Sequence, residues 1–171
     1  VILTGGTDTA LEMLRGKPDM KLLAETGGKN ATIVTALSDR EQAIAHVLHS
    51  AFSHSGQKCS ATSLLILEEE VYDDPDFRRA LCDAVKSLKV GSAWDRQTRV
   101  GPLIAPPEGA LESALKDLEP GESWAVRPQR LEDNPNLYSP GLKWGVQPGS
   151  VTHMTELFGP VLGVIKARDL P

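Results

Sequence analysis

The chain has 171 residues, of which 40% are hydrophobic and 24% charged, and its formal net charge is −5. This length suits one domain with a buried core, and the negative balance argues against nucleic acid or an anionic membrane as a partner. No 18-residue apolar run occurs, so we expect no membrane insertion. The only cysteines, Cys59 and Cys82, form no disulfide framework and favour a reducing, cytoplasmic compartment.

The N-terminal residues predict a strand, a turn and a helix. The strand covers residues 1–4, the turn contains Gly5 and Gly6, and the helix runs over about 9–15. Because exposed backbone N–H groups at a helix N-terminus favour an anion, such a turn can receive a phosphate, although two glycines are also a common plain turn. The chain begins within an apolar run and without Met, so we expect it to be a piece of a longer protein.

A carboxylate follows the second predicted strand. That strand covers residues 20–24 and is followed by Glu25 and two glycines, and the next buried strand covers 31–34. Glycines after a carboxylate let the backbone approach a ligand closely and leave the side chain accessible. From the local sequence alone, a solvated charge at the end of the strand is the favoured alternative for Glu25.

A helix is predicted after the third strand, because apolar residues recur with helical spacing. Ser38, with Glu41 three positions later, predicts a capping box at its start. Gly56 predicts its end, since glycine tolerates the left-handed conformation. The apolar stripe consists of Ile44, Val47, Leu48, Ala51 and Phe52.

Cys59 follows this helix on a glycine-containing loop. The apolar run 63–67 predicts a buried strand directly after it, so the thiol lies between two rigid elements. A thiol in this position is either a nucleophile or a structural cysteine. Cys82, in contrast, lies on the apolar face of a helix predicted over 76–89, where it is expected to pack in the core.

The C-terminal half predicts further α/β structure. A loop with glycines and Pro102 covers residues 90–104, and a helix can start near 106. Strands are predicted around 123–126, 138–146 and 161–166. Strands that alternate with helices imply the α/β class, with an open, largely parallel sheet flanked by helices.

Two further site hypotheses involve histidines. His46 and His49 share a helix face and lie near His54, but no carboxylate or cysteine completes a metal-ligand spacing, so we expect no metal. A hydrolase built on Cys59 and His54 needs the imidazole aimed at the sulfur, and a turn between the two usually points them apart.

Four segments together resemble the NAD(P)-dependent aldehyde dehydrogenase superfamily, in the order and with the separations of that family. They are Ile2-Leu-Thr-Gly-Gly-Thr7, Ala24-Glu-Thr-Gly-Gly-Lys-Asn30, Gly56-Gln-Lys-Cys-Ser60 and Glu156-Leu-Phe-Gly-Pro160. The stretch Val100-Gly-Pro-Leu-Ile104 is also similar. The resemblance implies a remnant of the dinucleotide-binding domain over 1–25 and an incomplete catalytic, thiol-bearing domain over 26–171.

By this resemblance Cys59 is the catalytic nucleophile and Glu25 the general base. A thiolate that adds to an aldehyde carbonyl gives a tetrahedral carbon able to expel hydride, and water then hydrolyses the resulting thioester. The implied cofactor is NAD, with its pyrophosphate near Gly5 and Gly6. The family more often has Ser where Gly6 stands. The resemblance also places Glu156 on the nicotinamide-side ribose and Phe158 near the nicotinamide.

The motifs look most like the L-glutamate γ-semialdehyde (1-pyrroline-5-carboxylate) dehydrogenase branch, which includes half of the bifunctional proline utilisation A proteins. In that branch the residues that flank the nucleophile, here Lys58 and Ser60, lie by the substrate. The implied partners are a small aldehyde, further copies in a homo-oligomer and a fused proline dehydrogenase domain. The alternatives are another aldehyde substrate, a thiol hydrolase or esterase on Cys59, and a non-catalytic module.

Overall fold

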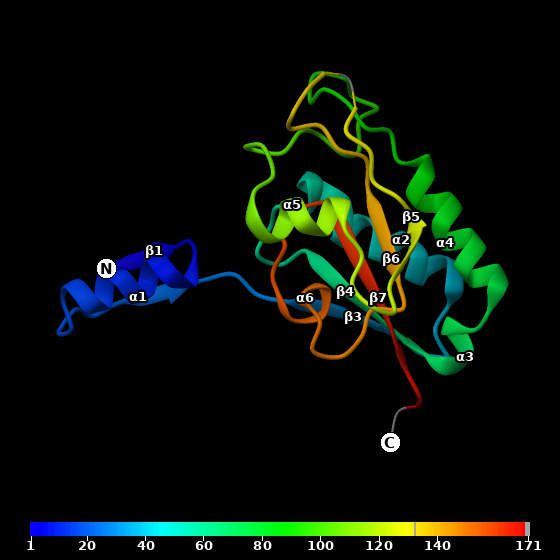
Figure 1. Ribbon diagram of the computed structural model, residues 1–171, viewed down its shortest axis with the longest axis horizontal. Helices are drawn as coiled ribbons and strands as arrows, with labels where there is room; N and C mark the ends of the chain where they lie inside the picture. The colour runs from blue at the N-terminus through cyan, green and yellow to red at the C-terminus, as the bar shows by residue number, and fades with distance from the viewer. Residues whose placement is uncertain (132, 170–171) are drawn as a thin grey trace.

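The computed structural model describes residues 1–131 and 133–169, so position 132 and the last two residues of the expected catalytic domain lie outside the description. The described chain has a small N-terminal unit and a larger body joined by an extended segment (Figure 1). In the small unit, β1 (Ile2–Thr4) pairs in parallel with β2 (Leu23–Glu25), and α1 (Thr7–Gly16) connects them. This confirms the predicted strand, glycine turn and helix.

The body is built on a five-stranded sheet with the order β3-β4-β7-β6-β5. All pairs are parallel except β5 with β6, which is antiparallel. The fold is therefore α/β with an open, largely parallel sheet, as the sequence predicts. The strands are β3 (Asn30–Val34), β4 (Thr62–Glu68), β5 (Ser123–Val126), β6 (Gly141–Trp144) and β7 (Val161–Ala167).

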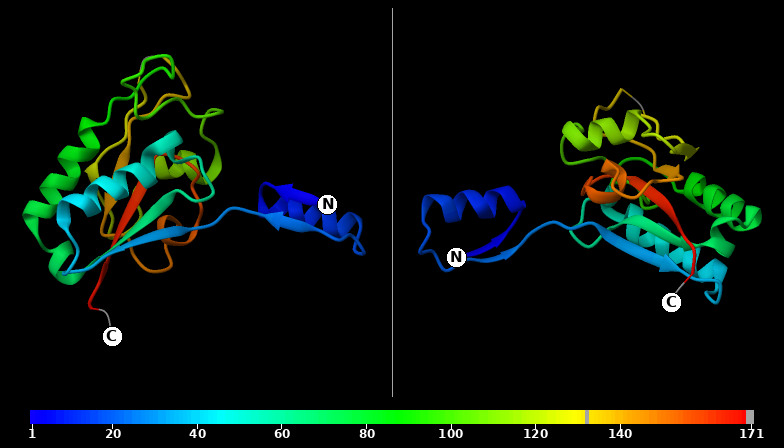
Figure 2. Two further views of the ribbon diagram at one scale, coloured as in Figure 1. Left: turned by 180° about the vertical axis from the view of Figure 1, so that it is seen from behind. Right: turned by 60° about the horizontal axis from the view of Figure 1, so that its bottom comes forward.

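Helices cover both faces of this sheet. Helices α2 and α4 lie on one face, and α5 and α6 lie on the other (Figures 1 and 2). None of the helices described is both long and apolar enough to cross a membrane. The body contains α2 (Arg40–Phe52), the 3-10 turn η1 (Ser53–Gly56), α3 (Glu69–Tyr72), α4 (Pro75–Ser87), α5 (Gly109–Lys116) and α6 (Val151–Met154).

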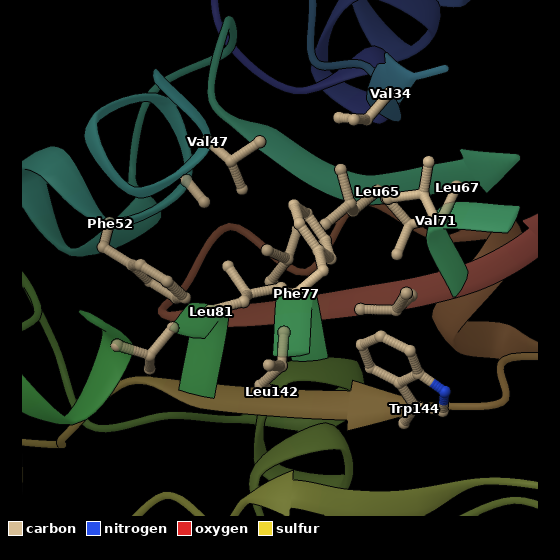
Figure 3. Close-up of a cluster of buried hydrophobic side chains, with 14 of the residues drawn as sticks. Val34, Val47, Phe52, Leu65, Leu67, Val71, Phe77, Leu81, Leu142 and Trp144 are labelled. Atoms are coloured by element: carbon tan, nitrogen blue, oxygen red, sulfur yellow. The ribbon is translucent and has the colours of Figure 1, made fainter. Parts of the chain in front are cut away.

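The main core lies between the sheet and helices α2 and α4 (Figure 3). Successive strand residues point to opposite faces, so Leu65 and Leu67 of β4 enter this core while Leu64 packs beneath the sheet against Val146 and Ile165. Burial on both faces explains why β4 is almost continuously apolar. The core therefore fixes both elements that flank Cys59, α2 before it and β4 after it.

The start of α2 differs from the prediction. Asp39 is the N-cap, and its carboxylate accepts a hydrogen bond from the backbone N–H of Gln42 at 2.8 Å. Ser38 instead accepts from the backbone N–H of Thr35 at 3.0 Å and closes the preceding turn. The predicted Ser38–Glu41 capping box is therefore wrong, because the neighbouring carboxylate satisfies the helix N-terminus and the hydroxyl is already used.

Candidate active site

The loop that carries Cys59 begins with a left-handed turn. The φ angles of His54, Ser55 and Gly56 are 53°, 58° and 70°, so two residues other than glycine occupy the region that glycine favours. Such conformations cost free energy and persist only where surrounding contacts enforce them. Cys59 follows this turn with its side chain exposed. Gly56 thus adopts the predicted conformation, although α2 itself ends earlier, at Phe52.

Two hydrogen bonds hold the turn against a remote segment. The hydroxyl of buried Ser55 donates to the carbonyl of Gly101 at 2.6 Å. The side-chain oxygen of Gln57 accepts from the backbone N–H of Ile104 at 3.0 Å. The loop with the thiol is therefore fixed by the 100–104 stretch, one of the segments with family resemblance.

The Cys59 loop also packs against the segment that contains Glu156. A Cβ added at Gly56 would overlap the backbone carbonyl of Gly159. Phe158, which precedes Gly159 in the chain, has a backbone φ of 52° and is partly exposed. The absence of a side chain at Gly56 therefore permits direct backbone contact between the two motifs.

Glu25 ends β2, and the glycines after it bring Glu156 close. A Cβ added at Gly27 would overlap the carboxylate of Glu156. The 24–30 motif thus contacts the 156–160 motif, and the 56–60 motif does so as well. In the sequence, more than a hundred residues separate Gly27 from Glu156 and Gly56 from Gly159.

One pocket of about 560 Å³ brings these segments together, between the N-terminal unit and the body. Glu25, Cys59 and Glu156 all line it, so the proposed nucleophile, base and ribose ligand share one cavity. The other lining residues are Thr4, Gly5, Gly6, Thr26, Gly27, Gln57, Lys58 and Phe158.

The residues beside the thiol face different cavities. Lys58 lines both the larger pocket and a second cavity of about 130 Å³, whereas Ser60 lines only the second, together with His49 and Ser53. Ser60 is thus on a different side of the loop from the pocket with Glu25 and Glu156. The sequence alone predicts both residues near substrate but does not separate the two sides.

The residues that the sequence reasoning missed follow Glu25 in the same motif. The amide Nδ2 of Asn30 donates to the carbonyls of Cys59, at 2.6 Å, and Ala61, at 3.3 Å. Lys29 donates to the carbonyl of Ser63 at 3.4 Å. Burial lowers the pKa of Lys29 to about 8, an effect that the nearby Glu156 carboxylate partly offsets. In the sequence, the feature that could have indicated this role is the side-chain amide of Asn30, which offers two N–H donors close to the expected base Glu25.

The N-terminal glycines are not equivalent. The backbone N–H of Gly5 donates to the carbonyl of Glu25 at 3.1 Å and so joins β1 to the end of β2. Gly6 is the N-cap of α1, where the first N–H groups of a helix have no intrahelical acceptor. Of the two, Gly6 is the residue placed at an anion-favouring helix end.

The second cysteine and the histidines give useful contrasts. Cys82 is half-buried beside the main core, and burial raises the pKa of its thiol. Within residues 1–131 and 133–169, no three His, Cys, Asp or Glu side chains are grouped so that they could hold a metal ion. His54 is exposed in the left-handed turn, and its side chain is not part of the lining of the pocket with Cys59.

The fold and the pocket define a chain in which a loop thiol and two carboxylates surround a cavity at the end of a parallel sheet. The model of the aldehyde dehydrogenase family matches residues 1–171, and the chain belongs to that family. This agrees with the resemblance of the four motifs.

Individual relatives support the same assignment. The chain is 35% identical to the 1-pyrroline-5-carboxylate dehydrogenase of Geobacillus thermodenitrificans, over 87% of this chain and 29% of the relative. It is 32% identical to the betaine aldehyde dehydrogenase of Bacillus subtilis, over 96% of this chain and 35% of the relative. The chain therefore spans about a third of the length of the curated relatives it matches.

A solved structure gives a closer match. The structure of Proline Utilization A from Corynebacterium freiburgense is 47% identical with a TM-score of 0.93, and the match covers 98% of this chain and 17% of that one.

Proposed function

We propose that this chain supplies the thiol-bearing part of an NAD-dependent aldehyde dehydrogenase that oxidises L-glutamate γ-semialdehyde to L-glutamate. The single observation that carries the proposal is the pocket that Glu25, Cys59 and Glu156 line together. In the proposed division, residues 1–25 belong to the dinucleotide-binding domain and residues 26–171 to the catalytic domain. The extended connection between the small unit and the body in Figure 1 supports this boundary.

Cys59 acts as the nucleophile. Its sulfur forms a bond to the aldehyde carbon, the C=O π bond breaks and Glu25 takes the thiol proton, which gives the oxyanion of a thiohemiacetal. The backbone N–H of Cys59 is a candidate donor to the resulting oxyanion. When bound, NAD would supply the hydride acceptor for this carbon, and Cys59 would then carry the thioester. Glu25 releases the first proton to solvent and then takes a proton from a water whose oxygen attacks the thioester carbon, after which the C–S bond breaks to release the acid and the Cys59 thiolate, which regains its proton from Glu25.

The pocket residues fit the cofactor. Gly6 at the start of α1 offers a helix end suited to a pyrophosphate. Glu156 and the partly exposed Phe158 line the pocket, where the carboxylate would accept hydrogen bonds from a ribose and the aromatic ring would offer an apolar surface to a flat ring. NAD, rather than NADP, follows from the branch that the motifs resemble.

The substrate and partners rest on the motif pattern and on similarity to the named relatives. The neighbour called Proline Utilization A, together with the 1-pyrroline-5-carboxylate dehydrogenases, favours L-glutamate γ-semialdehyde over other aldehydes. By the same reasoning, the protein that carries this chain forms a homo-oligomer and includes a proline dehydrogenase domain. Lys58 and Ser60, which flank the nucleophile, are the candidate substrate contacts.

NADH formation from L-glutamate γ-semialdehyde by the protein that carries this chain tests the proposal. Cys59→Ser should abolish NADH formation, because a hydroxyl is a far weaker nucleophile than a thiolate, whereas Cys82→Ser should leave it unchanged. Glu25→Gln should slow thioester hydrolysis about 10²-fold or more, with a smaller effect on the acylation burst. Undiminished steady-state turnover of Glu25→Gln would refute the base assignment, and ester cleavage without NADH formation would favour a thiol hydrolase.

A further inference from the structure

Asn30 contacts the backbone that directly follows the Cα of Cys59, where the reactive thiol is attached. Its side-chain amide donates to the carbonyl of Cys59 at 2.6 Å and to that of Ala61 at 3.3 Å. We propose that Asn30 is a positioning residue that fixes this backbone and so sets the direction in which the sulfur meets a carbonyl carbon. The inference rests on the proposed function of Cys59 as the nucleophile.

The strand pairing explains why such a residue is needed here. Asn30 opens β3 opposite Thr62, and the pairing of β3 with β4 shifts its register directly afterwards, so that Ser63 is an extra residue in β4. A bulge interrupts the regular ladder, and nearby carbonyls then need other donors. Asn30 supplies two donors, and Lys29 supplies a third to the carbonyl of Ser63 at 3.4 Å. Two consecutive side chains thus hold the segment that links the thiol to β4.

The same contacts define what Asn30 does not do. A primary amide has two N–H donors, and the carbonyls of Cys59 and Ala61 accept from the same nitrogen. With both donors used, Asn30 is not available to stabilise an oxyanion, so its effect on the reaction is indirect. Because a misplacement of about 1 Å can cost about 10²-fold in rate, loss of this support should slow acyl transfer measurably.

The test compares Asn30→Ala with Thr32→Val in the whole chain. Thr32 lies on the same strand, and its hydroxyl bonds to that of Thr62 at 2.8 Å, so this variant removes a hydrogen bond between the same two strands. Acyl transfer from p-nitrophenyl acetate to Cys59 is followed over a range of pH, and amide hydrogen exchange is measured over residues 57–61. Asn30→Ala should lower the limiting acylation rate about tenfold or more and accelerate exchange, whereas Thr32→Val should change neither.

A second variant guards against loss of folding. Asn30→Asp keeps the shape but removes both donors, so its limiting rate should fall as in Asn30→Ala, while its added charge affects the pH at half-maximal rate. The proposal would be overturned if the Asn30 variants kept the wild-type limiting acylation rate and the wild-type amide exchange over residues 57–61. It would also be overturned if Thr32→Val lowered the acylation rate and accelerated exchange as much as Asn30→Ala does. If wild-type Cys59 acylates no faster than Cys82, the proposed function fails instead, and the exchange data alone decide whether Asn30 holds the loop.

Discussion

Replacement of Gly56 by alanine tests whether direct contact between two motifs shapes the Cys59 loop. Gly56 has a φ of 70°, and a Cβ there would overlap the carbonyl of Gly159. Two costs therefore combine. A left-handed residue other than glycine costs about 1–2 kcal/mol, and overpacking adds about 1–3 kcal/mol, so Gly56→Ala should lower the free energy of unfolding by about 2–5 kcal/mol.

Gly109 provides a matched control that separates the two costs. Its φ is also positive, at 55°, but no atom lies within 4 Å of an added Cβ apart from its chain neighbours and the backbone of its own helix. Gly109→Ala should therefore cost only the conformational part, about 1–2 kcal/mol. Both free energies come from urea unfolding of the same chain under the same conditions.

The contact also predicts a local effect on the thiol. Because Gly56 lies three residues before Cys59, its displacement from Gly159 should change the alkylation rate of Cys59 but not that of Cys82. Gly109→Ala should change neither rate. Equal losses of stability in the two alanine variants, with an unchanged alkylation rate at Cys59, would refute the claim that close packing at Gly56 shapes the loop.

Two charged residues give further predictions. The Lys143 side chain is 2% exposed, and its ammonium group donates to the fully buried Glu122 carboxylate at 3.0 Å. Lys143→Met leaves this carboxylate without its counter-charge, so the free energy of unfolding in urea should fall by about 3–5 kcal/mol. The double variant Lys143→Met/Glu122→Leu should recover most of that loss. The pKa of Lys29 is about 8 in the folded chain and 10.5 in its ordinary state. Between these two pH values the unfolded chain binds more protons than the folded chain, so stability increases with pH. The free energy of unfolding should therefore rise by about 3 kcal/mol between pH 8 and 10.5. The Lys29→Met variant should lack this rise. Identical dependence of the unfolding free energy on pH in the wild type and in Lys29→Met would contradict the lowered pKa of Lys29.

The strands of the main sheet were predictable because local sequence determines them. Leu65 and Leu67 enter the core while Leu64 packs on the opposite face, and burial on both faces produces the continuous apolar run that marks a strand. The cap of α2 was not predictable in the same way. Ser38 and Asp39 are both good capping residues, and the choice depends on the turn that Ser38 makes with Thr35.

The site was predictable in its main residues but not in its supports. Glu25, Cys59 and Glu156 belong to segments that resemble one family, and their common pocket agrees with that reading. The role inferred for Asn30 depends on a register shift between β3 and β4, which is a long-range property of the sheet. The position of Ser60 on the second cavity depends on the left-handed turn before Cys59, and a positive backbone φ at a residue such as Ser55 leaves no clear local signal.

The two halves of the pocket are supported unequally. The thiol loop is held from three remote segments, through Asn30, the 101–104 stretch and Gly159. The N-terminal unit, which contributes Glu25, leaves Ile2 84% and Leu23 71% exposed. Few apolar contacts mean low local stability, so in the 171-residue chain by itself this unit should open more readily than the body. Nucleophilicity should therefore survive mild destabilisation that already disrupts the contribution of Glu25, and the two halves should be separable by titration with denaturant.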